Sequence, residues 1–144
     1  KIGHPNKFKE IACLKGEHSH TDWVRDVAWC PSIGAPYEIL VSCSEDNNLK
    51  IMLISRMDLL SFGEIPNQDK TILRNMTKES DGPVWRVSWS FAGNLLAVSS
   101  AGANLENIVE VYKVNINFVS LKKQENEQGI WEKISKIDDD AGSQ

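Results

Sequence analysis

HTDWVRDVAWCPS (residues 20–32) and a looser copy of it, GPVWRVSWSFAG (residues 82–93), decide the fold. Each copy contains a short segment, VRDVAW or VWRVSW, that ends in a tryptophan, and these tryptophans, Trp29 and Trp89, lie 60 positions apart. The same offset aligns two pairs of valines, Val24 with Val84 and Val27 with Val87. Self-similarity at a fixed offset is typical of repeat architectures, in which each repeat is one supersecondary unit. The chain is therefore predicted to contain two copies of one unit.

Each copy is followed by the same succession of short apolar runs and turns. The runs are rich in β-branched and apolar residues, which favours strands. The corresponding runs are ILVSCS (39–44) and LLAVSS (95–100), LKIMLI (49–54) and IVEVYKV (108–114), and KTILRNM (70–76) and IWEKISKI (130–137). Four short strands joined by turns are typical of a β-propeller blade. The predicted fold class is all-β, a β-propeller fragment of about two four-stranded blades plus one extra strand.

The repeat also predicts how the whole chain is organised. An inserted loop at residues 55–69 explains why the offset of 60 positions exceeds the ~40–45 residues of a common blade. The chain does not begin with Met, which suggests a processed product or a piece of something longer. The predicted segments are the last strand of a preceding blade in residues 1–19, a blade over 20–79 with a long loop at 55–69, a blade over 80–137 with an insertion at 115–129, and a disordered tail at 138–144.

Composition limits the classes of partner. The 144 residues carry a net charge of −4, so a nucleic-acid backbone would find little positive charge to bind, and no direct nucleic-acid partner is expected. No apolar run approaches the ~20 residues needed to cross a bilayer, and the N-terminus lacks the apolar core of a signal peptide. The sequence is therefore expected to act in the cytosol or nucleus.

Structural roles are predicted for the most distinctive side chains. Rigid aromatic and branched side chains fill the space between adjacent blades, so the blade core is predicted to contain Trp29, Trp89, Val27 and Val87. His20 precedes the first strand of its blade, and Asp46 lies in the following turn. These two residues are predicted to form a hydrogen-bonded structural clasp, because a buried charge is retained only when it is paired.

Cysteine and histidine spacing gives no metal or cofactor site. Cys13, Cys30 and Cys43 are odd in number and widely separated, so they are expected to be reduced, buried thiols. His18, His20 and Asp22 could in principle share a metal, but no second cluster completes a tetrahedral set. No metal, cofactor or catalytic residues are expected.

The motifs HTDWVRDVAWCPSIGAP, SCSEDNNLKIM and VWRVSWSFAGNLLAVSS resemble the last two blades of the WD-repeat family shared by the COPII outer coat and the Y-shaped complex of the nuclear pore, the Sec thirteen family. The resemblance covers roughly residues 8–137. It departs from the family where Met52 and Tyr112 replace the tryptophan near the end of each third strand. The second unit has no obvious equivalents of His20 and Asp46.

This resemblance implies a non-enzymatic scaffold. Family members form a six-bladed open propeller, and a coat or nucleoporin partner donates a further blade that closes the ring. The implied location is cytoplasmic, peripheral at endoplasmic reticulum exit sites and COPII vesicles, with the nuclear pore outer ring as a second site and membrane contact only through coat assembly. The last blade would then face the partner, and its candidate partner-facing residues are Val84, Trp85, Val87, Leu96 and Val98.

Three alternatives remain open. The first is a close paralogue that serves the nuclear pore and a nutrient-sensing complex. The second is a WD-repeat receptor that binds a peptide on its top face, although the sequence offers no aromatic cage or Arg cluster that can be placed there. The third is an enzyme, which the sequence disfavours because its serines lie in strands without a nucleophile elbow and no glycine-rich phosphate loop exists.

Overall fold

In a computed structural model of the chain, the structure describes residues 19–31, 37–57, 72–102, 104, 106–114 and 131–138. These residues form two four-stranded antiparallel sheets, each in sequence order, β1-β2-β3-β4 and β5-β6-β7-β8. The strands are β1 (Val24–Trp29), β2 (Tyr37–Ser44), β3 (Asn48–Ser55), β4 (Ile72–Glu79), β5 (Val84–Trp89), β6 (Leu95–Ala101), β7 (Asn107–Val114) and β8 (Trp131–Asp138). The prediction of an all-β, blade-like fold is confirmed.

Some predicted segments lie outside the described residues. They are the extra strand expected in residues 1–19, most of the loop at 55–69, the insertion at 115–129 and all but the first residue of the tail at 138–144. The blade boundaries therefore remain predictions. In the part of the chain that the structure describes, no helix has the length and apolar content needed to cross a membrane.

The two sheets repeat each other in detail as well as in outline. In β1 the pairing with β2 shifts between Val24 and Asp26, and in β5 the pairing with β6 shifts between Val84 and Arg86. These irregularities are 60 positions apart, like the tryptophans. A β-bulge adds one residue to one strand and re-aims its side chain. The first strand of each sheet is therefore bent at the same place.

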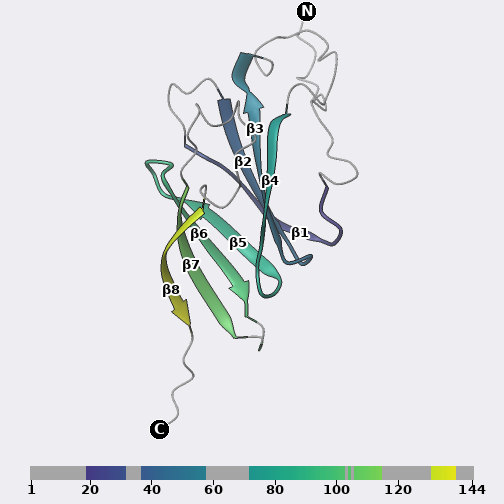
Figure 1. The fold of residues 1–144 in the computed structure, drawn as a ribbon, viewed down its shortest axis with the longest axis vertical. Coiled ribbons are helices and arrows are strands. Elements are labelled where there is room, and N and C mark those ends of the chain that lie inside the picture. Colours follow the sequence, from purple (N-terminus) through teal and green to yellow (C-terminus); the bar gives the residue numbers. More distant parts are fainter. Residues whose placement is uncertain are drawn as a thin grey trace, which may run out of the picture.

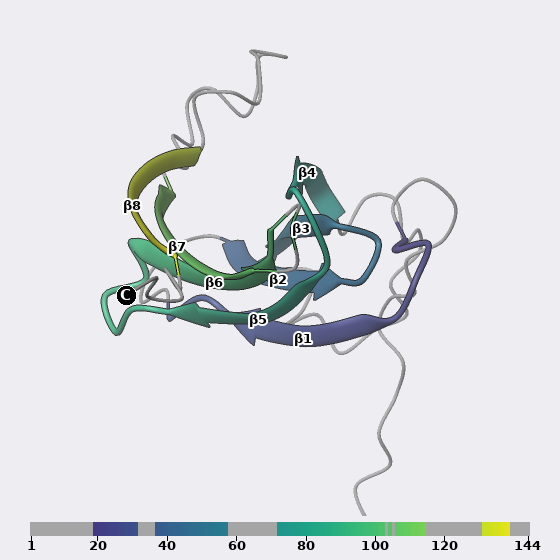
Figure 2. The same cartoon turned by 90° about the horizontal axis from the view of Figure 1, so that it is seen from below.

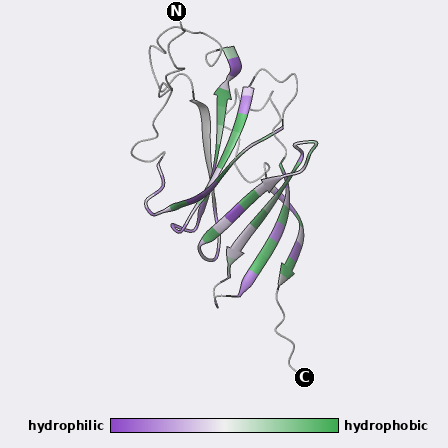
Figure 3. Ribbon diagram, turned by 180° about the vertical axis from the view of Figure 1, so that it is seen from behind, coloured by the Kyte–Doolittle hydropathy of each residue, from purple (hydrophilic) through white to green (hydrophobic). Residues whose placement is uncertain are grey.

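The sheets meet through their first strands. β5 packs against β1 and β2, and the later strands fan outward from that contact (Figures 1 and 2). Figure 3 shows apolar and polar residues alternating along the strands of the second sheet, as expected where opposite faces have different surroundings. The buried core between the sheets comprises Cys30, Ile39, Val41, Cys43, Leu49, Ile51, Leu53, Val84, Val87, Leu96, Val98 and Tyr112.

Polar contacts tie β5 to the first sheet beside this core. The indole nitrogen Nε1 of Trp89 donates to the backbone oxygen of Ala28 at 3.3 Å. The backbone nitrogen of Val87 donates to Asp26 Oδ2 at 3.2 Å, across the same interface. These bonds satisfy polar groups that would otherwise be partly buried without a partner. Trp89 packs against the core, as predicted.

The prediction that Trp29 and Val27 belong to the core is wrong for the described residues. Their exposed fractions are 53% and 56%, whereas that of Val87, which corresponds to Val27, is 5%. Equivalent residues lie on the same face of each sheet. In the second sheet that face packs onto the first sheet, whereas in the first sheet it points away from the second. The burial of Val87 therefore comes from its neighbouring sheet and not from its own sequence.

Adjacent leucines on opposite faces of β6 provide a test of this packing. Leu96 is fully buried between the sheets, whereas Leu95 is half-buried on the other face. Leu96→Ala should lower the free energy of unfolding by about 2–5 kcal/mol, the usual cost of a cavity in a core. Leu95→Ala is the matched control and should cost clearly less in urea-induced unfolding. Equal losses for the two variants would contradict the assignment of the core face.

Candidate functional site

The turn between β2 and β3 contains a polar cluster centred on Asp46. Asp46 accepts hydrogen bonds on both carboxylate oxygens. Oδ2 binds the backbone nitrogen of Thr21 at 2.9 Å, and Oδ1 binds the backbone nitrogen of Asn48 at 3.0 Å. The next residue, Asn47, has a φ of 65°, a left-handed conformation that Asn tolerates. Asp46 therefore holds the turn and the segment before β1 together.

His20 lies against this carboxylate. Its Nδ1 is 2.9 Å from Asp46 Oδ2 and 3.1 Å from Oδ1, and its Nε2 is 2.9 Å from the hydroxyl oxygen of Ser42. The side chains of His20 and Asp46 are 3% and 4% exposed. The geometry is that of the proposed clasp, with Ser42 as a third member that the sequence did not reveal. Ser42 is in β2, so only knowledge of the strand register could have identified it.

Ser42, His20 and Asp46 have the hydrogen-bond order of a catalytic triad. A nucleophilic serine must, however, be reachable by the bond it attacks. Ser42 is buried within β2, paired with Val27 on one side and Lys50 on the other. A substrate carbonyl cannot approach its hydroxyl in this position. The trio is therefore arranged for structure and not for acyl transfer.

The cluster lowers the pKa of Asp46. Burial alone would raise this pKa, but the hydrogen bonds from the Thr21 backbone, His20 and the Asn48 backbone favour the charged form and bring it below its usual value. A carboxylate held in this way stabilises the fold while it is ionised. The ionised carboxylate of Asp46 therefore contributes to the stability of the first sheet.

The second sheet has no such clasp among its described residues. The substituted tryptophan positions, Met52 and Tyr112, are both buried. The Tyr112 hydroxyl donates to Glu110, and burial, together with this carboxylate, raises the pKa of Tyr112 well above its ordinary range. Tyr112 therefore remains a neutral donor.

The predicted partner-facing residues mostly face inward. Val84, Val87, Leu96 and Val98 are buried between the two sheets, and Trp85 alone among the five candidates is exposed. The prediction was wrong about these four because strand alternation sends them to the face that meets the first sheet. The opposite side, here called the outer face, comprises Leu95, Ala97, Ser99, Val109, Val111 and Ile137, which are half-buried or exposed.

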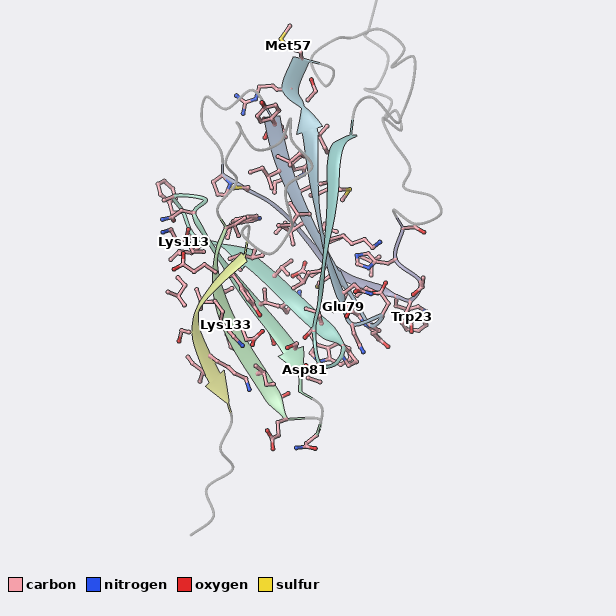
Figure 4. All side chains as sticks on the ribbon, viewed as in Figure 1. Trp23, Met57, Glu79, Asp81, Lys113 and Lys133 are labelled. Atoms are coloured by element: carbon pink, nitrogen blue, oxygen red, sulfur yellow. The ribbon has the colours of Figure 1, made fainter. Side chains whose placement is uncertain are left out.

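An aromatic and arginine cluster was missed by the sequence reasoning. The guanidinium carbon of Arg25 lies 4.9 Å from the ring centroid of Trp23 and 5.5 Å from that of Trp85, and it forms an ion pair with Glu45. Figure 4 shows Trp23 at the edge of the first sheet. Arg25 and Trp85 occupy the bulge positions of β1 and β5, so only the matching bulges could have revealed that they meet.

The cysteines and possible metal ligands show no reactive site in the described ranges. Cys30 and Cys43 are free and buried, and burial raises the pKa of Cys43 to about 11, so its reactive thiolate form is suppressed. Cys13 and His18 lie outside the described residues. No group of three His, Cys, Asp or Glu side chains in the described part of the chain could hold a metal ion.

Comparisons with known proteins point in one direction. The family model described as "WD domain, G-beta repeat" matches residues 9–51. The chain is 37% identical over 129 residues to "Protein transport protein SEC13 homolog A" of Arabidopsis thaliana, covering 90% of this chain and 34% of that protein. It is 33% identical over 125 residues to "Protein SEC13 homolog" of Homo sapiens, covering 87% of this chain and 31% of that protein. The chain spans about a third of the length of the curated relatives it matches.

Removing the histidine tests whether the clasp stabilises the fold. His20→Ala should lower the free energy of unfolding by about 1–3 kcal/mol, because it strands buried Asp46 and Ser42 without their partner. Thr21→Ala is the control, since its contact with Asp46 uses the backbone nitrogen, which alanine retains. A urea midpoint for His20→Ala equal to that of the control would argue against a stabilising clasp.

The lowered pKa of Asp46 predicts a pH dependence. The stabilisation by its carboxylate should be fully present above the unfolded-state pKa, about 3.9 for aspartate. It should be lost as the pH falls through the lower pKa of the folded state. The difference in unfolding free energy between the parent and Asp46→Asn should therefore shrink on acidification below about pH 4. A difference that stays constant between neutral and strongly acidic pH would refute this linkage.

Proposed function

Because the chain belongs to the SEC13 family of WD-repeat proteins, we propose that it is a non-enzymatic scaffold subunit of the COPII vesicle coat. In this role its blades form part of an open propeller, and a partner protein donates a further blade that packs on the outer face. The protein acts in transport from the endoplasmic reticulum to the Golgi, peripheral to the membrane. A second role in the nuclear pore outer ring follows from the same blade-accepting geometry.

The observation that carries this proposal is the equivalence of two sheet faces. The first sheet packs onto the second through one face of β2 and β3. The register pairs show that the same face of the second sheet is its outer face. The face that the first sheet turns toward the second sheet is therefore equivalent to the face that the second sheet turns outward. Such a head-to-tail contact can be repeated until a ring closes.

The residues on these equivalent faces differ in character. The outer face is less apolar, because smaller or polar side chains replace large ones. The equivalent positions, with the residue of the first sheet given first and that of the second sheet given second, are Ile39 and Leu95, Val41 and Ala97, Cys43 and Ser99, Leu49 and Val109, Ile51 and Val111, and Leu53 and Lys113. A mixed surface of this kind suits a blade supplied by a separate chain, since a fully apolar face would be costly to leave in water before assembly.

Two alternatives make different predictions. The paralogue of the nuclear pore and a nutrient-sensing complex would use the same outer face with another scaffold partner. A peptide receptor would instead use the bulge residues, and the contact of Arg25 with Trp23 and Trp85 is the observation in its favour. Affinity purification would distinguish the coat subunit from the paralogue by the identity of the partner. Mapping of the protected surface would distinguish a scaffold from a receptor.

Blade donation predicts where the partner protects the protein. The full-length protein would be co-expressed with a coat partner that carries a three-stranded donor segment, and amide hydrogen exchange would be compared with that of the free protein. We expect increased protection in β7 and β8. Protection confined to the segments around Trp23 and Trp85 would favour the receptor instead.

A substitution on the outer face provides a second test. Val109→Asp should weaken partner binding at least about tenfold, because it buries an unpaired charge at the contact. Phe91→Asp is the control, since Phe91 is almost fully exposed in the turn after β5. Equal affinity for Val109→Asp and the control in a pull-down or calorimetric titration would remove the outer face from the proposal.

A further inference from the structure

A cavity of about 300 Å³ lies between the end of β4 and the inner side of β7 and β8. Its lining includes the acidic residues Glu79, Asp81 and Glu110 and the basic residue Lys133. Figure 4 labels Glu79, Asp81 and Lys133 around this part of the second sheet. A space of this size holds one long side chain. It lies between the sheets on the inner side of the second one, away from the outer face of the proposed scaffold contact.

The cavity borders the place that corresponds to the clasp of the first sheet. Ser80 lies 60 positions after His20, and it is one of the lining residues. The register aligns Ser42 with Val98 and Ser44 with Ser100. Two residues after the second pair, Gly102 stands at the position of Asp46. Loss of the imidazole and of the carboxylate leaves both volume and unfilled hydrogen-bonding capacity. The second sheet therefore has a cavity in the region where the first sheet has the hydrogen-bonded clasp.

The charges around the cavity favour a cation. Asp81 lines the cavity, and the lysine of the lining, Lys133, is already engaged, with its Nζ 2.6 Å from Glu110 Oε1. Among the described residues, no cation forms an ion pair with Asp81. The carboxylate of Asp81 can therefore pair with an added cation, and charge-assisted hydrogen bonds to a carboxylate are about twice as strong as neutral ones.

Ser100 gives an independent sign of an unfilled site. It is 2% exposed and lines the cavity. Within the described ranges, its hydroxyl has no hydrogen-bond partner. Its counterpart in the first sheet, Ser44, both donates to Asp22 and accepts from Asp46. A buried hydroxyl without a partner is uncommon and calls for a ligand or a water.

We propose that this cavity binds the basic side chain of a partner peptide, a guanidinium or alkylammonium group. The group pairs with the carboxylate of Asp81 and donates a further hydrogen bond to the hydroxyl of Ser100. Arginine matches this arrangement well because its planar fork carries five donors. Tyr112 and Ile108 supply the rest of the wall against which the aliphatic stem packs. This binding is separate from the proposed acceptance of a donated blade.

The test is a titration of the protein, observed by two-dimensional amide NMR, with N-acetyl-arginine amide, N-acetyl-lysine amide and N-acetyl-citrulline amide. Citrulline has nearly the shape of arginine but no charge. We expect saturable shifts at Ser100, Ile108 and Tyr112 with a basic ligand at millimolar concentration, and at least about tenfold weaker binding of citrulline. The arginine and lysine arms identify which basic group the cavity prefers. Equal binding of citrulline, or shifts confined to other residues, would overturn the proposal.

A charge-matched pair of variants completes the test. Asp81→Asn should weaken binding of the basic ligand about tenfold, whereas Glu106→Gln, which removes an exposed carboxylate outside the cavity, should leave it unchanged. Urea unfolding of both variants checks that the fold is intact. Unchanged affinity in a folded Asp81→Asn variant would overturn the assignment of this cavity. Loss of affinity in both variants would show only nonspecific attraction to an acidic protein and would also overturn it.

Discussion

The packing of β5 against β1 and β2 is the interaction on which the rest of the structure depends. A four-stranded sheet has two faces, and neither can remain largely apolar in water unless another layer covers it. Here the two sheets meet through opposite faces, so the contact is directional. Val87 is buried and Trp89 packs against the core, whereas the corresponding Val27 and Trp29 are exposed. Burial in this fold therefore depends on the position of a sheet in the stack.

The clasp attaches the first sheet to the segment that precedes its first strand. In the first sheet Asp46 binds backbone and side-chain donors from both the entering segment and the β2–β3 turn. Because both oxygens of the carboxylate accept hydrogen bonds, the charge can be buried without a large penalty. The second sheet dispenses with this device and relies on the Trp89 indole, the contact of Tyr112 with Glu110 and the core between the sheets.

The two-blade fold could be predicted from the sequence because strands and turns depend on local residue patterns. The repeat supplied independent support, since it matched the strands of one unit to those of the other. It also predicted the contact of His20 with Asp46, since both residues flank predictable strand ends. It could not predict which face of each strand is covered, and Val84, Leu96 and Val98 were therefore assigned to the wrong surface. The role of Ser42 depends on strand register, and the contact of Arg25 with Trp85 depends on the bulges. Register and bulges arise from pairing between strands, so the sequence of one strand does not reveal them.

The charge at one strand position changes sign between the two repeats, and this gives them different chemical surroundings. In the first sheet, Lys50 pairs with Ser42 beside the clasp, and in the second sheet the equivalent pair is Glu110 with Val98. A lysine at this position is compatible with a neighbouring acidic clasp. A glutamate there, with Asp81 and Glu79 close by, turns the corresponding region acidic and draws Lys133 from β8 toward it. Two repeats with the same backbone thus carry opposite charges at one position, so a shared architecture supports a closed structural contact in one blade and an acidic, open cavity in the other.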